Sequence, residues 1–513
     1  MYVLKHEHKI LHKGKSQNLM HDIRGYTPVQ ASDEPVNIFD SEFELSHFRS
    51  QNNNDNNKKD SQNNLEGEEV ETEDREDTNE ITNGNYDIDD NYDDDNEFVN
   101  DVIRENNKKS TMKWAFMNMA NSILGAGVIG QPIAVKNCGI IGAVIAYLVL
   151  FILVDWTLRL IVVNLTLAGK KTYQDTVAFS MGKRGRIVVL TANGLFAFGG
   201  CIGFCIIIGD TLPHVLRAFI PQDSVFLSRR SIITIVTVFI SYPLALQRNI
   251  AALSKASFLA LISMVIIVFT VIIRGPEIHA KRDPLTWEDI LLTPKIFRGI
   301  SVISFALVCH HNTSFIYFSI KNRSLQKFNK LTHISTSISV VFCMIMGFSG
   351  FAAFGQNTKG NVLNNFSADD KAVNIARLCF GFNMLTTFPL ELFVLRDVMA
   401  SFIMGNQPNG DPNVLSKKNH FILTTILVFG TMSISLLTCN LGAIFELIGA
   451  TTASMMAYIL PPWVNLLLTR DKTFRQKLPY FACIAFGFSI MLISSVQTIL
   501  DTVKGSDQKH CEL

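Results

Sequence analysis

Long apolar segments separated by short charged connections dominate the chain after Ser110. Many of them reach the roughly 18 to 25 residues that an α-helix needs to cross a hydrocarbon core. Only 52 of the 403 residues from Thr111 onward are charged, which is about half the usual density of roughly 25%. A water-soluble globule is therefore excluded, and the sequence predicts an all-α polytopic membrane protein.

Eleven membrane-spanning helices are expected where apolar runs are bounded by charges or turn signals. These are residues 114–136, 139–164, 186–217, 230–247, 256–274, 298–320, 331–355, 371–400, 419–439, 442–468 and 478–500. The expected organisation is a polar tail (1–110), a transmembrane domain (111–500) and a short C-terminal tail (501–513).

The first 110 residues differ from the rest of the chain in charge and composition. They hold 27 acidic and 12 basic residues, a net charge of −15, together with an Asn run at 51–57. Such a composition cannot bury enough apolar surface to offset the entropy of ordering, so a disordered tail is expected. A binding role for trafficking or regulatory proteins is the functional alternative to a plain solvated tail.

The distribution of Lys and Arg predicts the orientation in the membrane. Alternate connections carry eighteen of them on one side and eleven on the other, tails excluded. The richer side is expected to be cytosolic together with the N-terminus, and an odd number of spans places the C-terminus in the lumen. The sequon Asn365-Phe366-Ser367 falls in a predicted non-cytosolic connection, where glycosylation is topologically allowed.

The first predicted span is rich in helix breakers. Gly125, Gly127, Gly130 and Pro132 fall within eight residues. Inside a bilayer, unpaired backbone groups are costly unless they face protein or a hydrated cavity, so a break here indicates a polar ligand site. The alternative is a close helix-packing face of small residues.

The sixth span carries polar residues at mid-membrane: His310, His311 and Asn312. Interrupted spans at positions one and six are what an inverted five-plus-five helix repeat produces. Half-helix ends then offer amides to a carboxylate and carbonyls to an ammonium, which suits a zwitterion. The histidines line this site or serve packing and gating. A catalytic role lacks a partner, because no HExxH or GxSxG motif is present.

Four segments carry a family resemblance. NMANSILGAGVIGQPIAVKNCG (118–139) resembles the first-helix signature of the amino acid/auxin permease family, and SFALVCHHNTSFIYFSI (304–320) is similar to its sixth-helix segment. TTFPLELFVLRD (386–397) and IFELIGATTASMMAYILPP (444–462) look like its eighth and tenth. The resemblance spans about 114 to 500 and implies the amino acid–polyamine–organocation architecture, with ten helices in the inverted repeat and an eleventh appended.

The same resemblance implies site residues. The substrate would be held by Asn118, Asn121, Ser122, Gly125, Ala126 and Gly127. Asn121 and Thr387 align with residues tied to Na⁺ binding in sodium-coupled relatives. The acidic, Asn-rich tail also resembles that of fungal vacuolar amino acid transporters, and a vacuolar location would favour protons as the driving ion. The sequence leaves Na⁺ and H⁺ both open.

Intramembrane carboxylates are the candidates for proton coupling. Glu391 and Glu446 lie deepest, with a structural hydrogen-bonding role as the alternative. Asp155 and Arg159 are one helical turn apart and are expected to form an internal ion pair. Asp210, near the end of the third span, is expected to be solvated.

The preferred function is secondary active transport of neutral amino acids across a vacuolar membrane by alternating access, with no cofactor beyond the coupling ion and no nucleic-acid partner. The alternative from another class is an amino acid sensor that signals through the cytosolic tail with little net flux. A membrane enzyme is disfavoured because no nucleophile and base or cofactor motif is visible.

Overall fold

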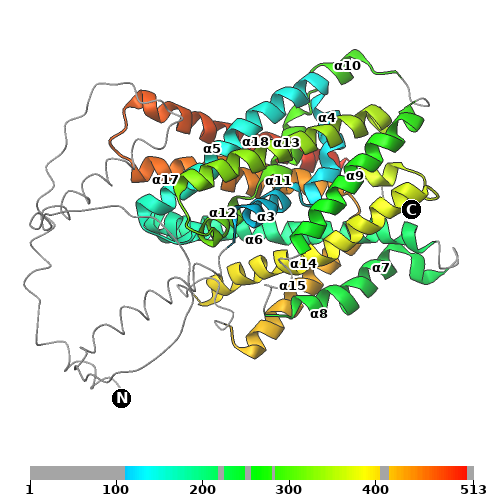
Figure 1. Ribbon diagram of the computed structural model, residues 1–513, viewed down its shortest axis with the longest axis horizontal. Helices are drawn as coiled ribbons and strands as arrows, with labels where there is room; N and C mark the ends of the chain where they lie inside the picture. The colour runs from blue at the N-terminus through cyan, green and yellow to red at the C-terminus, as the bar shows by residue number, and fades with distance from the viewer. Residues whose placement is uncertain (1–109, 218–223, 249–255, 280–283, 405–414, 505–513) are drawn as a thin grey trace, which may run out of the picture. The chain divides into compact units, whose positions relative to one another are not determined.

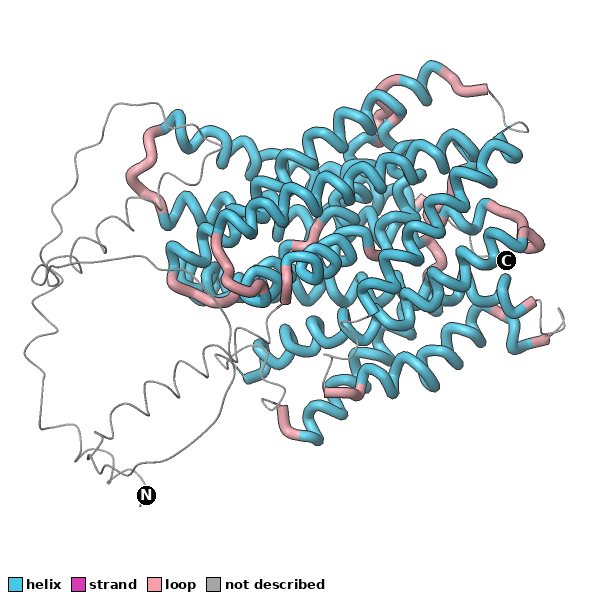
Figure 2. Tube along the Cα trace, in the orientation of Figure 1, coloured by secondary structure: helices cyan, strands magenta, loops and turns pink. Residues whose placement is uncertain are grey.

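A computed structural model describes residues 110–217, 224–248, 256–279, 284–404 and 415–504, which form a bundle of α-helices without any strand in these ranges. Figure 2 shows that short loops and turns connect the helices. The predicted tail before Ser110 and most of the predicted C-terminal tail lie outside the described residues.

The first half of the bundle begins with an interrupted helix. Its elements are α3 (Met112–Leu124), the 3-10 turn η1 (Ala126–Gly130), α4 (Gln131–Cys138), α5 (Ile140–Ala168), α6 (Tyr173–Leu216), η2 (Val225–Leu227), α7 (Arg229–Val236), the π-turn η3 (Thr237–Ser241), α8 (Tyr242–Ala245) and α9 (Ala256–His279).

The second half also begins with an interrupted helix, after a short surface helix α10 (Trp287–Ile290). Its elements are α11 (Ile296–Leu307), η5 (His310–Asn312), α12 (Thr313–Ser319), α13 (Leu325–Phe354), η6 (Gly355–Asn357), η7 (Val362–Asn365), α14 (Lys371–Met404), α15 (Lys417–Leu437), α16 (Leu441–Ile448), the π-turns η8 (Gly449–Ala453) and η9 (Met455–Ile459), α17 (Leu460–Leu468) and α18 (Phe474–Val503).

Nine stretches of the described chain are long and apolar enough to cross a membrane. Each of them overlaps one of the eleven predicted spans. The two remaining predictions, 114–136 and 230–247, correspond to α3–η1–α4 and to α7–η3–α8, which are divided into shorter pieces. A count of eleven crossings therefore stays a prediction.

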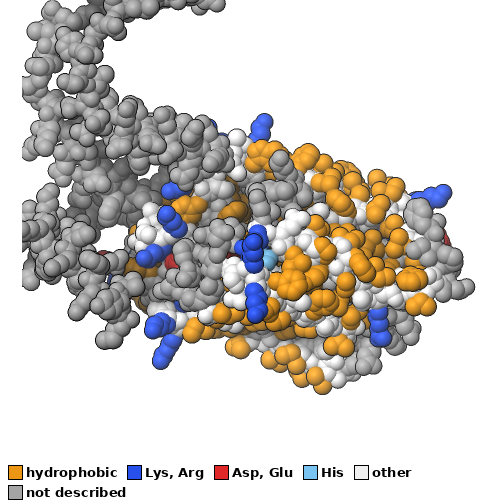
Figure 3. Space-filling model, turned by 90° about the horizontal axis from the view of Figure 1, so that it is seen from below, with side chains coloured by type: hydrophobic (Ala, Val, Ile, Leu, Met, Phe, Trp, Pro, Cys, Tyr) orange, Lys and Arg blue, Asp and Glu red, His pale blue; other side chains and the backbone are white. Residues whose placement is uncertain are grey.

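Large apolar side chains point outward along the helices. Phe239 is 73% exposed, Ile273 65% and Leu492 62%. In the face drawn in Figure 3, apolar side chains cover most of the described surface, and Lys and Arg lie in small groups among them. Soluble proteins rarely expose apolar area on this scale, so this surface fits a lipid environment.

Local sequence signals define several helix ends. Gly169 adopts φ 62°, the left-handed conformation that closes α5, because glycine has no Cβ to clash there. At the start of α18, Thr473 and Gln476 form a reciprocal capping box. The first described residue, Ser110, pairs with the strand-like segment after α12: its N–H donates to Ser319 O (2.8 Å), and its carbonyl accepts from Lys321 N–H (3.0 Å).

The interrupted helices lie inside the bundle. In Figure 1, α3, α11 and α12 run through its middle, between α5 and α13 on one side and α14 on the other. Helix α11 packs on α4, α5, α16 and α18, and α13 packs on α3, α4, α5 and α9. Both interruptions are consequently enclosed by protein.

Candidate functional site

The first interruption falls at Gly125, between α3 and η1. Gly125 has φ −19° and ψ −138°, so it leaves the helical conformation, and its N–H caps α3 by donating to Asn121 O at 3.0 Å. The amides of Ala126 and Gly127 begin a new helical segment, where the first N–H groups have no acceptor within the helix. The predicted break in the first span is confirmed.

The second interruption falls at Val308 and Cys309, between α11 and η5. Val308 is extended (φ −80°, ψ 111°) and Cys309 has φ −120° and ψ 20°. Helix α11 ends as Val308 N–H donates to Ser304 O at 3.1 Å. Its last carbonyls face the break, and the first amides of η5 and α12 lie across it. The predicted break in the sixth span is confirmed as well.

The two interruptions lie side by side. A Cβ placed on Gly127 would lie 2.4 Å from Ala306 Cβ and 2.5 Å from Ala306 Cα, so the η1 and α11 backbones are in direct contact. Farther along the same pair of helices, a Cβ on Gly299 would lie 2.3 Å from Cys138 Sγ. Glycine at these positions permits the close approach, so the packing role of the small residues and the helix breaks occur together.

This arrangement places opposite helix ends next to each other. The starts of η1 and η5 carry partial positive charge from free amides, and the ends of α3 and α11 carry partial negative charge from free carbonyls. Ser122 and Asn312 bridge the two breaks, with Asn312 Nδ2 donating to Ser122 Oγ at 3.5 Å. Such a site can hold a carboxylate and an ammonium at once.

The two histidines have different surroundings. His310 is completely buried, and its Nε2 lies 2.9 Å from Thr157 Oγ1 of α5. His311 is half-buried and its ring lies against Phe196 of α6, with centroids 4.9 Å apart. His310 therefore joins the break to α5, whereas His311 is the more exposed of the two and packs on α6.

Aromatic rings cover the interruptions on the α6 and α16 side. Phe305 of α11 stacks on Phe445 of α16 with centroids 4.3 Å apart, and Phe196 lies 5.7 Å from Phe305. A Cβ on Gly130 would lie 3.1 Å from Phe445 Cδ2, so this ring also rests on the first interrupted helix. The site is thus bounded by an apolar wall as well as by polar backbone.

The predicted Na⁺ ligands are not joined to each other in the described chain. Thr387 Oγ1 bonds within α14, to Asn383 O at 2.8 Å and to Asn383 Oδ1 at 3.1 Å. Asn121 is half-buried on α3, and α3 and α14 are not principal packing neighbours. Asn118, one helical turn before Asn121, is half-buried on the same helix.

Glu391 lies on α14 against α6. A Cβ on Gly200 would lie 3.5 Å from Glu391 Cγ. Glu391 Oε1 is buried without a hydrogen-bond partner in the described part of the chain. A carboxyl in this state can carry a proton more readily than one that is held by a cation.

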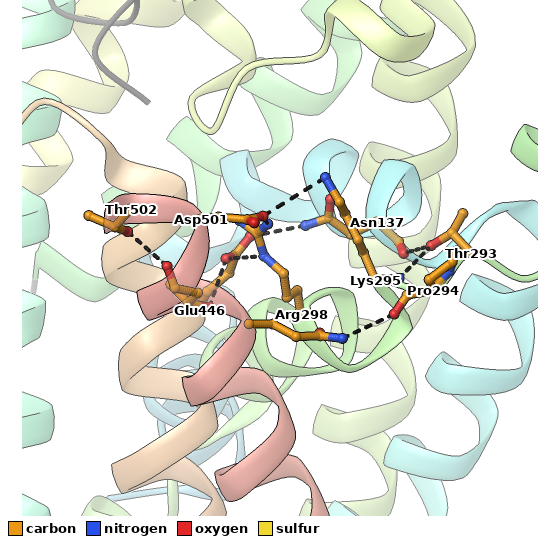
Figure 4. Close-up of polar contacts among 10 residues, drawn as sticks. Asn137, Thr293, Pro294, Lys295, Arg298, Glu446, Asp501 and Thr502 are labelled. Carbon is orange, nitrogen blue, oxygen red and sulfur yellow. Dashed lines mark hydrogen bonds and ion pairs between the residues drawn. The ribbon is translucent and has the colours of Figure 1, made fainter. Parts of the chain in front are cut away.

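Glu446 is held instead by a polar network at one end of the site (Figure 4). Its Oε2 accepts from Arg298 Nε at 2.7 Å and from Thr498 Oγ1 at 3.1 Å, and its Oε1 accepts from Asn137 Nδ2 at 3.0 Å. Arg298 also pairs with Asp501 of α18. The network ties both interrupted helices, through α4 and α11, to α16 and α18.

The two other intramembrane carboxylates turn out differently. The ion pair between Asp155 and Arg159 is confirmed at 2.9 Å, and His333 Nδ1 of α13 lies 2.9 Å from Asp155 Oδ1. The expectation of a solvated Asp210 is wrong. Asp210 is 6% exposed and pairs with Arg229 Nε at 3.0 Å, because α7 folds back against α6 and removes its carboxylate from water.

Sequence reasoning missed Thr157, Phe196 and Arg298. Thr157 and Phe196 stand in apolar runs without any local motif, so no signal marks them. Arg298 counts as a loop charge in the predicted topology, but it is 9% exposed. The presence of a buried Glu446 could have indicated that a nearby span supplies a cation.

Comparison with known proteins gives the same picture. The family model described as "Transmembrane amino acid transporter protein" matches residues 108–500. "Vacuolar amino acid transporter 2" of Saccharomyces cerevisiae is 62% identical over 429 residues, covering 82% of this chain and 89% of that protein. Relatives named "Putative sodium-coupled neutral amino acid transporter 11" are 32% identical in Danio rerio (78% of this chain, 90% of that protein) and 31% in Mus musculus (79% and 90%). The chain, with its two interrupted helices in contact inside a helical bundle, belongs to the transmembrane amino acid transporter family, which is a family of transporters and not of enzymes.

Proposed function

We propose that this protein moves neutral amino acids across the vacuolar membrane by secondary active transport with alternating access. The observation that carries the proposal is the contact between the two interrupted helices at Gly127 and Ala306, which gathers free amides and carbonyls at one place inside the bundle. The name of the Saccharomyces cerevisiae relative supports the vacuolar location.

The architecture is proposed to be an inverted repeat of five helices plus five. The elements from α3 to α9 form one half and those from α11 to α17 the other, with α18 appended. Both halves begin with an interrupted helix, as such a repeat requires. Alternating access would then move the two interrupted helices, which pack tightly on each other, against the remaining helices.

The substrate is proposed to lie between the interruptions. Its carboxylate would accept from the amides of Ala126 and Gly127, and its ammonium would face the last carbonyls of α3 and α11. The polar side chains at hand are those of Asn118, Asn121, Ser122, His311 and Asn312. A neutral side chain would rest against Phe196 and Phe305, where no charged group is needed.

The coupling ion is H⁺ or Na⁺. Glu391 supports H⁺, because its Oε1 is buried without a partner in the described ranges. Glu446 is already satisfied by three hydrogen bonds, so a structural role suits it better than proton transfer. Na⁺ coupling through Asn121 and Thr387 would require both side chains to face one ion, whereas Thr387 Oγ1 is bonded to Asn383 within α14.

The proposed orientation places the N-terminus in the cytosol and the C-terminus in the lumen, from the distribution of Lys and Arg. The Asn365 sequon contributes nothing to this assignment. Its carboxamide accepts from Lys359 N–H at 2.9 Å and donates one N–H to Asn357 O at 2.8 Å, which neither supports nor excludes a glycan.

The decisive experiment reconstitutes the full chain in liposomes and measures uptake of a panel of radiolabelled amino acids. Gradients of pH and of Na⁺ are imposed separately, with protein-free liposomes as the control. Uptake of neutral amino acids above their equilibrium level under one gradient is the expected result. Saturable binding without gradient-driven uptake would overturn the proposal and favour the sensor instead.

A further inference from the structure

A polar cavity of about 460 Å³ lies at the network of Arg298, Glu446 and Asp501, which all line it. Its walls come from the ends of α4, α6, α11 and α18, from the start of α7, and from α16 with the two residues before it, together with the connection between α13 and α14. Neither Gly125 nor Gly127 lines it, so the cavity does not include the helix breaks and adjoins them through the network around Glu446. Figure 4 shows part of its polar wall, where Arg298, Glu446 and Asp501 meet.

The charges of this cavity do not balance. Six cationic side chains line it against three carboxylates. Each carboxylate is already paired: Asp210 with Arg229, and both Glu446 and Asp501 with Arg298. Lys295 adds a longer contact to Asp501 at 3.9 Å.

Three cations are therefore left without an acidic partner among the described residues. Within the ranges that the structure describes, no ion pair involves Lys136, Arg217 or Lys359. In the described part of the chain, the ammonium groups of the two lysines donate to backbone carbonyls, Lys136 to Thr358 O at 3.4 Å and Lys359 to Asn364 O at 3.3 Å.

Like charges also face one another around the cavity. Lys136, Lys295 and Arg298 line it together at the ends of α4 and α11. Arg217 and Lys359 line it together with His214, whose Nδ1 is buried and has no hydrogen-bond partner among the described residues. Cations held together in a concave surface create a strong local field that attracts a counter-ion.

We propose that this cavity binds a small oxyanion between Lys136, Arg217 and Lys359. The ligand chemistry is a carboxylate or a phosphate group, because both offer several oxygens to cationic donors that approach from different walls. The two sources of such a group are the carboxylate of an amino acid that passes through the cavity and a free inorganic anion. The inference does not depend on the direction of transport or on the coupling ion.

The test uses the purified full-length protein in lipid nanodiscs and measures binding of radiolabelled inorganic phosphate by equilibrium dialysis. Lys136→Gln and Arg217→Gln each remove one free cation. Loss of a charge-assisted hydrogen bond weakens affinity by about tenfold or more, so we expect that loss in each variant. Lys171→Gln is the matched control, since Lys171 is an exposed lysine in another connection, and it should bind as the wild type does.

Competition distinguishes the two sources. Alanine that displaces phosphate, while alanine methyl ester does not, would identify the amino acid carboxylate as the natural ligand. Displacement by acetate but not by alanine would identify a free anion. The proposal is overturned if the wild type retains no more phosphate than empty nanodiscs, or if Lys171→Gln weakens binding as much as Lys136→Gln. Size-exclusion profiles and melting temperatures of all variants verify that they are folded.

Discussion

Replacing Gly127 by alanine tests the contact on which the proposed site depends. The new methyl group would lie 2.4 Å from Ala306 Cβ and 2.5 Å from Ala306 Cα, whereas ordinary contacts begin at 3.4 Å. Since one of the two opposing atoms belongs to the backbone, side-chain rotation cannot relieve the clash. The η1 and α11 backbones must separate by about 1 Å, and overpacking of this kind costs about 1–3 kcal/mol.

The expected result is a loss of at least about tenfold in gradient-driven uptake of neutral amino acids, because the separation displaces the amides and carbonyls that would hold the substrate. The assay is uptake into liposomes at matched protein content, with thermal unfolding measured in parallel. Gly430→Ala is the control, since a Cβ at Gly430 meets no atom within 4 Å. It should retain both uptake and stability.

A double variant that combines Gly127→Ala with Ala306→Gly extends the test. Ala306→Gly removes the Cβ at position 306 but leaves its Cα 2.5 Å from the new methyl group at position 127, so uptake by the double variant should remain impaired. If Gly127→Ala alone keeps uptake within twofold of the wild type while remaining folded, the close backbone contact has no part in transport and the reasoning is refuted.

Three further predictions concern single hydrogen bonds and charges. Thr157→Val leaves the buried His310 Nε2 without its partner and should destabilise the protein by about 1–3 kcal/mol in thermal unfolding; Thr166→Val, which loses only a bond to its own helix, should cost less, and equal losses would contradict the role given to the histidine. Glu391→Gln should abolish the stimulation of uptake by a pH gradient while exchange at equal pH persists, and full stimulation in this variant would exclude Glu391 as the proton carrier. The last prediction concerns Asp370, which pairs with Arg274 of α9. Partial burial raises the pKa of the Asp370 carboxyl, but hydrogen bonds from Arg274 and from two backbone N–H groups outweigh burial and leave this pKa below its ordinary value. A lowered carboxyl pKa contributes stability above the unfolded pKa of about 3.9 and loses it as the pH falls through the folded value. Asp370→Asn should therefore lower the free energy of unfolding by about 1 kcal/mol or less. The resulting drop in melting temperature should be the same at pH 7 and at pH 5, and a drop that shrinks across that range would contradict the assignment.

Apolar periodicity and helix breakers were sufficient to predict most of the fold. The apolar runs located most helices to within several residues, because burial of backbone polar groups in a bilayer leaves few alternatives to a helix. The exception is α6, which begins at Tyr173, thirteen residues before the predicted start at 186. The dense glycines near Gly125 and the polar run at His310 likewise predicted both interruptions. These are local properties, and a single sequence contains them directly.

Pairings between distant segments were not predictable in the same way. Arg298 and Glu446 are separated by 148 positions, and nothing in the residues around either one indicates the other. Arg229 and Asp210 illustrate the same limit, since the return of α7 onto α6 decides that both are buried. Both arginines stand among the eleven cations of the poorer side, so leaving them out changes the comparison to eighteen against nine.

The backbone pairing of Ser110 with the segment after α12 has a mechanical consequence. Two backbone hydrogen bonds join Ser110 to Ser319 and Lys321, just before α3 begins. A pulling force transmitted through the residues before Ser110 would thus act on α12 as well as on α3. A protein that binds the N-terminal segment would therefore act on both interrupted helices through one attachment point.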